Sequence, residues 1–521
     1  MEIDPPAPIY LDYAATTPLD PHVLKAMLPY LTTHFGNPAS LHGQGRQAAA
    51  AVAQARAQVA SLLNADAREI IWTSGATEAN NLAIKGAAHF YQAKGRHLIT
   101  ARTEHRSVLD ACGALVKQGY ALTLLEPGSD GRISPAQLAA AIRPDTILVS
   151  LMHVNNETGI VQDIAALGEV CRRHGVKFHV DAVQGAGKLA LNLARLSVDY
   201  LSISAHKLYG PKGIGALYVR REPRARLEPL LHGGGHERGL RSGTLPVPLI
   251  VGFGTAAALA AQALAQEQVR LMELRERLWC RLSALGGVLR NGAAETTFPG
   301  ILNVSFEGVN GEGLFAGIGD RLGIATGSAC SAAEQEPSYV LRALGRDDVL
   351  AQASLRISLG RSTGVRQIDA AAQVILDEVR RLRQLDQGDE QLTQSSAQPW
   401  HEDYSPQVWA HFYHSAQVGA PVDAGWRIGE AGARSAGRYI RLAMRLGKQG
   451  IEARFCALGC PVTIACGAWL SQQLCGLDPH QASTLDAEQL AQALQLTAVQ
   501  RASAVLAEDA LRAALTQETF A

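Results

Sequence analysis

A lysine at the end of an apolar strand is the first residue of this sequence whose position suggests chemistry. Residues 198–201 predict a buried strand, and Lys207 follows in the stretch Ser202–Gly213, which closes in a turn rich in Gly and Pro. Burying an ammonium group is costly unless chemistry uses it, and a desolvated lysine is suited to form a Schiff base with a carbonyl cofactor. Taken alone, the pattern fits a surface lysine on a loop equally well.

A second chemical group follows another predicted strand. Asp181 stands at the end of the apolar run 177–180, where a carboxylate can pair with a pyridinium nitrogen. With Lys207, these segments resemble fold-type I pyridoxal-phosphate (PLP) enzymes of the class V aminotransferase group, and most closely the cysteine desulfurases of the IscS/NifS type. The resemblance implies PLP as the cofactor, Lys207 as the lysine that binds it and Asp181 as the partner of its ring nitrogen.

Further cofactor contacts are expected at other strand ends. A glycine turn that opens a helix, with Ala76 and Thr77, suits a phosphate group because backbone N–H groups point out of a helix start. By resemblance, His105 lies over the cofactor ring as an acid–base group. The resemblance also implies that Asn156 and Gln184 contact the phenolic oxygen, that Ser204 and His206 contact the phosphate, and that Thr244 reaches the phosphate of a partner subunit in a homodimer.

The loop that carries Thr244 contains two histidines, His232 and His236, which are separated by three glycines. Two histidines four residues apart suggest a metal site when they share a helix face. The intervening glycines make such a helix unfavourable, so we do not expect a metal in this loop.

A cysteine among small and polar residues is the predicted nucleophile. Cys330 lies in the run 326–342, which is suited to a loop able to move between a substrate and an acceptor. One such cysteine could be an incidental free thiol, but the surrounding run resembles the persulfide-forming loop of the desulfurases. The resemblance also places Arg356 and Asn37 at the substrate, with the guanidinium binding the substrate carboxylate.

The expected reaction is therefore the conversion of L-cysteine to L-alanine with a persulfide on Cys330, which supplies sulfur for iron–sulfur cluster or thio-cofactor biosynthesis. Two rival hypotheses stay open. The first keeps the fold and changes the reaction to that of a selenocysteine lyase or a transaminase, and a transaminase would not need Cys330. The second is a non-catalytic assembly or regulatory protein, which the complete set of PLP-site residues argues against.

Alternating strands and helices must position these groups. Apolar strands are predicted at residues 70–73, 97–100, 121–125, 146–150, 177–180 and 200–203, with helical stretches between them. This alternation predicts an α/β domain whose mostly parallel sheet is covered on both faces, with the site outside the carboxyl ends of the strands. We expect a large PLP-binding domain at 1–260, whose first ~15 residues pack with a smaller α+β domain at 261–384.

Composition narrows the function further. The 521 residues include 48 Lys and Arg and 48 Asp and Glu, so no global charge favours nucleic acid or an anionic membrane. The first residues lack the basic and apolar regions of a signal peptide, and the apolar run 249–261 is short enough to be a core helix. Eight cysteines are too sparse for a disulfide scaffold, and we expect reduced thiols and a cytoplasmic protein.

The last third of the chain is a separate unit. Residues 385–403 are polar and predict a linker, which would tether the domain 404–521 within reach of a docking face on the desulfurase. Residues 404–521 resemble the U-type iron–sulfur scaffold protein, and predict a helix at 404–413, strands at 438–446 and 451–458, and later helices.

This scaffold-like domain lacks most of the expected cluster ligands. Where the scaffold family has three cysteines and an aspartate, this chain has Ala436, Arg438, Cys460 and Ser503. One thiolate cannot supply the four ligands that a cluster normally takes. Cys456 and Cys466 lie near Cys460 in sequence, and a zinc site formed by the three is conceivable, but its spacing matches no established zinc pattern. We therefore expect a degenerate scaffold domain. Cys460 remains a candidate metal ligand or sulfur acceptor.

Overall fold

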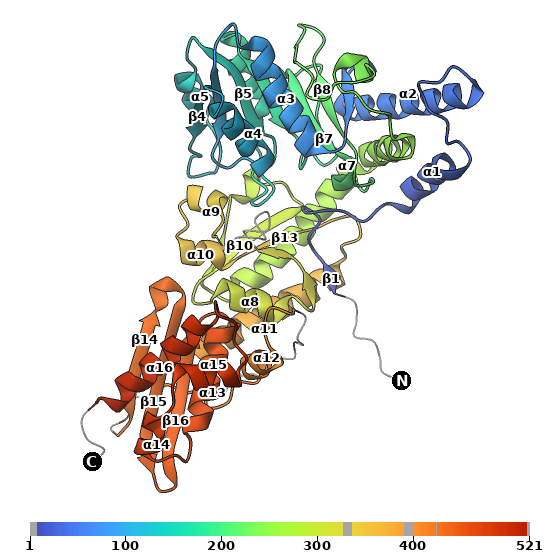
Figure 1. The fold of residues 1–521 in the computed structure, drawn as a ribbon. Coiled ribbons are helices and arrows are strands. Elements are labelled where there is room, and N and C mark those ends of the chain that lie inside the picture. Colours follow the sequence, from blue (N-terminus) through green and yellow to red (C-terminus); the bar gives the residue numbers. More distant parts are fainter. Residues whose placement is uncertain are drawn as a thin grey trace.

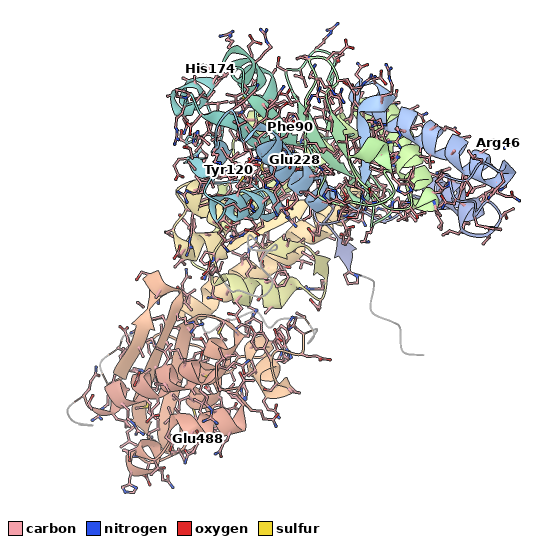
Figure 2. All side chains as sticks on the ribbon, turned by 45° about the horizontal axis from the view of Figure 1, so that its top comes forward. Arg46, Phe90, Tyr120, His174, Glu228 and Glu488 are labelled. Atoms are coloured by element: carbon pink, nitrogen blue, oxygen red, sulfur yellow. The ribbon has the colours of Figure 1, made fainter. Side chains whose placement is uncertain are left out.

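The computed structural model describes residues 8–326, 336–389, 397, 401–421, 423 and 425–517, so that the predicted nucleophile Cys330 lies outside the described residues. Three parts follow one another along the molecule (Figure 1). Figure 2 shows the large domain, which carries His174, and the C-terminal domain, which carries Glu488, at opposite ends. The small domain lies between them.

The sheet of the large domain has seven strands in the order β2-β8-β7-β6-β5-β3-β4. The strands are β2 (Ile70–Thr73), β3 (His97–Ala101), β4 (Ala121–Leu125), β5 (Thr146–Met152), β6 (Lys177–Asp181), β7 (Tyr200–Ser204) and β8 (Gly215–Val219). The strands from β7 to β4 are parallel, whereas β8 is antiparallel to both of its neighbours. The predicted mostly parallel sheet is confirmed, and β8 is the strand that the sequence pattern missed.

Helices cover both faces of this sheet and enclose two apolar cores. One core contains α3 (Ala76–Tyr91) and α4 (Arg106–Val116). The other contains α2 (Gly43–Leu63), α5 (Pro135–Ala141), α6 (Ile164–Arg173) and the first half of α7 (Val247–Ser283), with α1 (Pro21–Thr32) packed on α7. Short 3₁₀ turns lie at Ala67–Glu69, Ala205–Lys207, Glu237–Gly239, Ala294–Thr296 and Arg434–Ala436.

Helix α7 joins the large and small domains. Its first half, up to Ala260, packs in the large-domain core, and its second half, from Leu271, packs in the small-domain core. The predicted domain boundary at residue 260 therefore falls inside one continuous helix, which ends at Ser283. By length and composition α7 could cross a membrane, but its contacts with α1, α2 and α11 make it a core helix.

The small domain is built on an antiparallel sheet in the order β12-β13-β10-β9. Its strands are β9 (Val288–Arg290), β10 (Ile301–Phe306), β12 (Ala325–Thr326) and β13 (Ser354–Ser358), and its helices are α8 (Gly311–Ile318), α9 (Tyr339–Ala343), α10 (Asp348–Gln352) and α11 (Val365–Gln387). The first strand of the chain, β1 (Ile9–Tyr10), pairs with β11 (Leu322–Gly323). The start of the chain thus packs with the small domain.

The C-terminal domain has a three-stranded antiparallel sheet, β14 (Arg427–Ala433), β15 (Arg438–Gly447) and β16 (Gly450–Leu458). Its helices are α12 (Pro406–Tyr413), α13 (Pro461–Leu474), α14 (Pro479–Ser483), α15 (Ala487–Ala493) and α16 (Arg501–Leu515). The strands predicted at 438–446 and 451–458 are present, whereas β14 was not predicted.

The C-terminal domain packs directly on the small domain. Helix α11 continues to Gln387 and Leu385 is fully buried, so the predicted linker begins three residues too early. One apolar core runs from the small domain into the C-terminal domain, and the Tyr413 hydroxyl donates to the Ala316 carbonyl at 3.2 Å. Burial of shared apolar surface holds the two parts together, so residues 404–521 lie packed against the small domain and not only within reach of it.

Candidate active site

Residues at the carboxyl ends of the parallel strands enclose a cavity of about 610 Å³. The cavity lies at this edge of the sheet because the carboxyl ends of the parallel strands meet there. The cavity brings together ten of the residues predicted from the sequence: Ala76, Thr77, His105, Asn156, Asp181, Gln184, Ser204, His206, Lys207 and Arg356.

Lys207 lies in the 3₁₀ turn that follows β7, and its ammonium group contacts the start of the chain. The Nζ atom donates to the carbonyls of Ala14 at 2.5 Å and Ala15 at 2.6 Å. The side-chain amide of Gln184 donates to the same Ala14 carbonyl at 2.8 Å. The segment after β1 therefore forms one wall of the site, a role that sequence reasoning missed because backbone carbonyls leave no signal in residue types.

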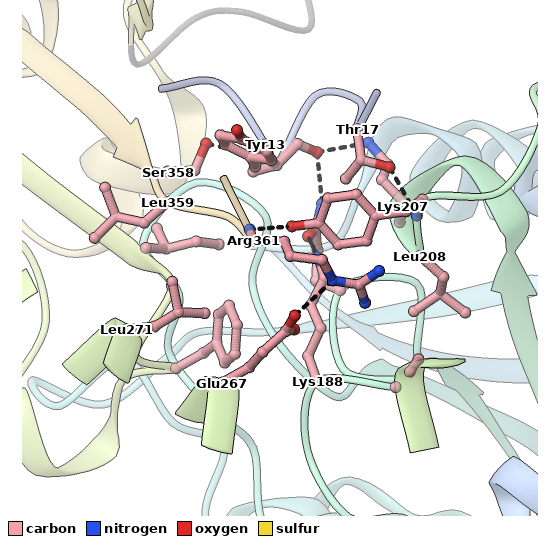
Figure 3. Close-up of a pocket in the computed structure, with 18 of the residues that line it drawn as sticks. Tyr13, Thr17, Lys188, Lys207, Leu208, Glu267, Leu271, Ser358, Leu359 and Arg361 are labelled. Atoms are coloured by element: carbon pink, nitrogen blue, oxygen red, sulfur yellow. Dashed lines mark hydrogen bonds and ion pairs between the residues drawn. The ribbon is translucent and has the colours of Figure 1, made fainter. Parts of the chain in front are cut away.

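A second lysine was also missed. Lys188 lies behind Gln184 and donates from Nζ to the Gln184 Oε1 at 2.9 Å. Burial, together with the nearby positive charge of Lys207, lowers the pKa of Lys188 to about 7. Figure 3 shows Lys188 and Lys207 at one hollow, which Arg361 and Glu267 close with a 2.6 Å ion pair. The only sequence signal was a lysine in the apolar stretch 186–191.

The carboxylate of Asp181 is held in place at the end of β6. It accepts hydrogen bonds from the Asn80 side chain at 2.8 Å and from the Val183 backbone at 3.0 Å. His105 caps α4, with its Nδ1 accepting from the Ser107 backbone at 3.1 Å. Burial lowers the pKa of His105, so that a neutral imidazole faces the cavity at neutral pH.

The cavity wall also includes a helix start, which is suited to an anion. The first turn of α3, with Ala76 and Thr77, opens onto the cavity, and N–H groups at a helix start favour phosphate. Ser204 and His206 line the same cavity. Burial lowers the pKa of His206 to about 4, so its imidazole is neutral there, and its Nδ1 lies 3.2 Å from the Thr16 hydroxyl.

Two buried carboxylic acids beside the cavity were not predicted. Burial raises the pKa of Glu104 well above its ordinary value, and the Met152 backbone donates to one of its oxygens at 2.8 Å. Burial also raises the pKa of Glu157 to about 7, and the Ser338 hydroxyl donates to it. The Tyr339 hydroxyl donates to the Glu104 carbonyl at 2.7 Å. These bonds fix the chain that follows the Cys330 segment to the large domain.

Two predicted residues lie outside the cavity, and a third falls outside the described residues. Asn37 is exposed, and its side chain accepts from the Ala39 backbone at 2.9 Å, which forms a local turn. Thr244 is exposed and does not line the cavity of its own chain within the described residues. Cys330 lies outside the described residues, so its place relative to the cavity stays a prediction.

The candidate thiol of the C-terminal domain is buried. The Cys460 sulfur lies 3.4 Å from the Thr463 hydroxyl, which in turn lies 3.1 Å from the Ser503 hydroxyl. Burial raises the pKa of the Cys460 thiol, and the nearby Glu312 on α8 raises it further. Within the described ranges, no group of three or more His, Cys, Asp or Glu side chains could hold a metal ion.

The fold and the cavity together define the site of a fold-type I PLP enzyme. A lysine and an aspartate end two neighbouring parallel strands, a histidine lies with them, and a helix start supplies the anion site. These groups fit PLP, which needs an amine for its aldehyde, a carboxylate for its ring nitrogen and N–H donors for its phosphate.

Comparisons with known proteins agree with this class. Residues 9–371 match the class-V aminotransferase family. The curated cysteine desulfurase IscS of Methylococcus capsulatus is 56% identical over 379 residues, which cover 73% of this chain and 94% of that protein. That of Serratia proteamaculans is 56% identical over 381 residues, with the same coverage. The chain belongs to the class-V aminotransferase family, in the group of its cysteine desulfurase relatives.

Solved structures and the C-terminal region add three further likenesses. A NifS-like protein superposes with a TM-score of 0.68 at 35% identity and covers 72% of this chain and 99% of its own. SspA in complex with cysteine has a TM-score of 0.60 at 42% identity, and covers 67% and 98%. Residues 403–518 match the NifU-like N-terminal domain, so the expected scaffold-like region is confirmed.

Proposed function

We propose that this protein is a PLP-dependent cysteine desulfurase, which converts L-cysteine to L-alanine and carries the released sulfur as a persulfide on Cys330. The observation that carries the proposal is the cavity in which Lys207, Asp181, His105 and Arg356 meet. The similarity to curated cysteine desulfurases over nearly their whole length supports the same substrate. The sulfur is destined for iron–sulfur cluster or thio-cofactor biosynthesis, in the cytoplasm.

Each side chain of the cavity has a distinct task. When bound, PLP supplies an electron sink for the bond changes at the substrate carbon. Lys207 would hold the cofactor through its Nζ, and as a free amine it would move a proton at the substrate Cα. Asp181 keeps the proton on the ring nitrogen, and its hydrogen bonds to Asn80 and Val183 fix its orientation. Arg356 binds the substrate carboxylate.

The sulfur step balances without any external oxidant. The Cys330 thiolate attacks the substrate sulfur, a sulfur–sulfur bond forms and the substrate carbon–sulfur bond breaks. The electron pair of the broken bond stays with the substrate carbon, which takes up a proton to give the methyl group of alanine. Because the Nδ1 of His105 accepts a backbone hydrogen bond, the Nε2 of His105 is the nitrogen that exchanges protons in the cavity.

A homodimer is part of the proposal. Apolar side chains are exposed along α1 and the loop after it, namely Leu24, Leu28, Leu31, Phe35 and Leu41. Such a row is typical of a protein interface. Thr244 lies outside the cavity of its own chain, which fits a contribution to the partner's phosphate site.

The dimer can be tested by mixing two inactive variants. Lys207→Ala and Thr244→Ala subunits should exchange into mixed dimers in which one site has both residues. Random exchange of equal amounts makes about half of the dimers mixed, and each mixed dimer has one intact site of two, so PLP binding and turnover should recover to about a quarter of the wild-type values. No recovery after verified subunit exchange would show that Thr244 acts within its own chain or not at all.

The activity itself is tested by product analysis. Purified protein given L-cysteine and no keto-acid acceptor should form L-alanine and sulfide in equal amounts when a thiol reductant is present. The Lys207→Ala variant should form neither. Alanine formation that requires a keto acid would indicate a transaminase, and a faster reaction with selenocysteine that bypasses Cys330 would indicate a selenocysteine lyase.

A further inference from the structure

Arg356 is an almost completely buried arginine that already has partners on two of its nitrogens. It lies on β13, lines the cavity and is 3% exposed. Its Nη1 donates to the Asn156 carbonyl at 3.1 Å, and its Nη2 forms a 2.8 Å ion pair with the Asp12 carboxylate. Its Nε has no hydrogen-bond partner among the described residues. Arginine has five N–H donors, so donors remain for a ligand.

The fold fixes Asp12 beside this arginine. Asp12 follows β1, and its backbone bridges to Ser358 on β13, two residues beyond Arg356. The Leu11 backbone on one side of it donates to Gly323 at 2.7 Å, and the Ala14 backbone on the other side donates to the Ser358 hydroxyl at 2.9 Å. The carboxylate of Asp12 is therefore a permanent neighbour of Arg356, held by the sheet and not by a flexible loop.

The position of Asp12 has an electrostatic consequence for any anionic ligand. Arg356 carries one positive charge, and the partly buried Asp12, 20% exposed, already balances it. A ligand carboxylate at Arg356 brings a second negative charge into the same region. Water screens this repulsion only weakly because both side chains are largely removed from solvent. Of these two side chains, that of Arg356 lines the cavity and that of Asp12 does not, so a ligand and Asp12 can contact the guanidinium at the same time.

We propose that Asp12 is a specificity-determining residue, which holds the Arg356 guanidinium in place and weakens the binding of an amino-acid carboxylate by partly cancelling its charge. This inference rests on the proposed function, in which Arg356 is the carboxylate site. Asp12 also keeps the buried arginine paired when no substrate is present. The site therefore discriminates in favour of ligands that add contacts beyond the carboxylate, as a substrate thiol does.

The test uses the PLP-loaded full-length protein and two matched ligands. L-alanine carries a carboxylate and no thiol, so it binds without turnover, and ethylamine is the same amine without the carboxylate. Binding is followed by the change in cofactor absorbance. Asp12→Asn keeps the size and the hydrogen-bond acceptor but removes the charge. It should bind L-alanine about tenfold more tightly than the wild type and ethylamine equally well.

The chain offers a control at a neighbouring ion pair. Asp20 pairs with Arg361 at 2.8 Å, and neither residue lines the cofactor cavity. Asp20→Asn should therefore leave the binding of both ligands unchanged. Asp12→Ser serves as a second variant if the Asn variant is poorly folded, and it should show the same direction.

The outcomes separate the inference from the proposed function. Arg356→Gln should weaken L-alanine binding and spare ethylamine, and failure of this result overturns the carboxylate site itself. If Arg356→Gln behaves as expected but Asp12→Asn binds L-alanine equally or more weakly, the inference about Asp12 is wrong while the proposed function stands. A gain for ethylamine as large as that for L-alanine would also overturn it, because the effect would not act on the carboxylate.

Discussion

Replacement of one buried arginine should undock the C-terminal domain. Arg381 and Glu378 on α11 form a 2.6 Å ion pair in which each side chain is 2% exposed. The Arg381 Nη1 also donates to the Phe412 carbonyl on α12 at 2.8 Å, and its guanidinium lies 4.5 Å from the Phe412 ring centre. Arg381 is thus bonded both to its own helix and to the C-terminal domain.

The expected size follows from burial. Removing one partner of a buried ion pair costs about 3–5 kcal/mol, because the other charge stays buried without compensation. In Arg381→Ala, the Glu378 carboxylate regains water most readily if α12 separates from α11. Even ~3 kcal/mol changes an equilibrium by more than about a hundredfold, since each ~1.4 kcal/mol is a factor of ten.

Hydrogen–deuterium exchange of the full-length protein can measure this opening. The amides of α12 should exchange on the order of a hundredfold faster in Arg381→Ala than in the wild type. The control is Arg380→Ala, whose ion pair with Asp377 is half exposed and contributes little. Exchange in α12 at the wild-type rate in folded Arg381→Ala, or equal acceleration in both variants, would refute the reasoning.

Three further outcomes follow from the structure. Burial raises the pKa of Glu157 to about 7. The stability that the neutral form of Glu157 contributes is therefore fully present below the ordinary carboxyl pKa, and it is lost as the pH rises through 7. Between about pH 5 and 8, the wild type should therefore lose about 3 kcal/mol relative to Glu157→Gln in thermal unfolding, and a constant difference would contradict this. Full-length protein reconstituted with iron and sulfide should hold no [2Fe–2S] cluster, because the buried Cys460 is the one expected ligand that remains. A stoichiometric cluster that is lost in the Cys460→Ser variant would contradict this. Lys188→Met should raise the dissociation constant of PLP severalfold by freeing Gln184, and unchanged PLP affinity would speak against a positioning role.

The sequence predicted the elements that build the cavity because their signals are local. Apolar runs with polar ends marked the strands that became β2 to β7, and parallel pairing then brought Asp181 and Lys207 to one edge. The antiparallel strand β8 was missed because it breaks the alternation of strands and helices and begins with Gly215. Strand β14 contains Gly429 and Gly432, which are poor strand formers, and only its pairing with β15 makes it extended.

Other features depend on contacts that no local pattern carries. Lys188 and Glu157 resemble surface residues in the sequence, and only the packed structure shows that Glu157 is buried and that Lys188 is partly buried. The end of α11 was missed for the same reason, since polar residues after Leu385 suggested a linker. The helix continues because Leu382 and Leu385 pack in the core shared with the C-terminal domain.

The central claim is most directly tested at Cys330. The PLP-loaded wild type should be given L-cysteine without reductant, and its peptides analysed by mass spectrometry after alkylation. A persulfide on Cys330, formed in step with one L-alanine for each active site, is the predicted result. The Cys330→Ser variant should still change its cofactor absorbance with L-cysteine but form no persulfide. Persulfide formation in that variant, or alanine release from the wild type with Cys330 unmodified, would contradict the account.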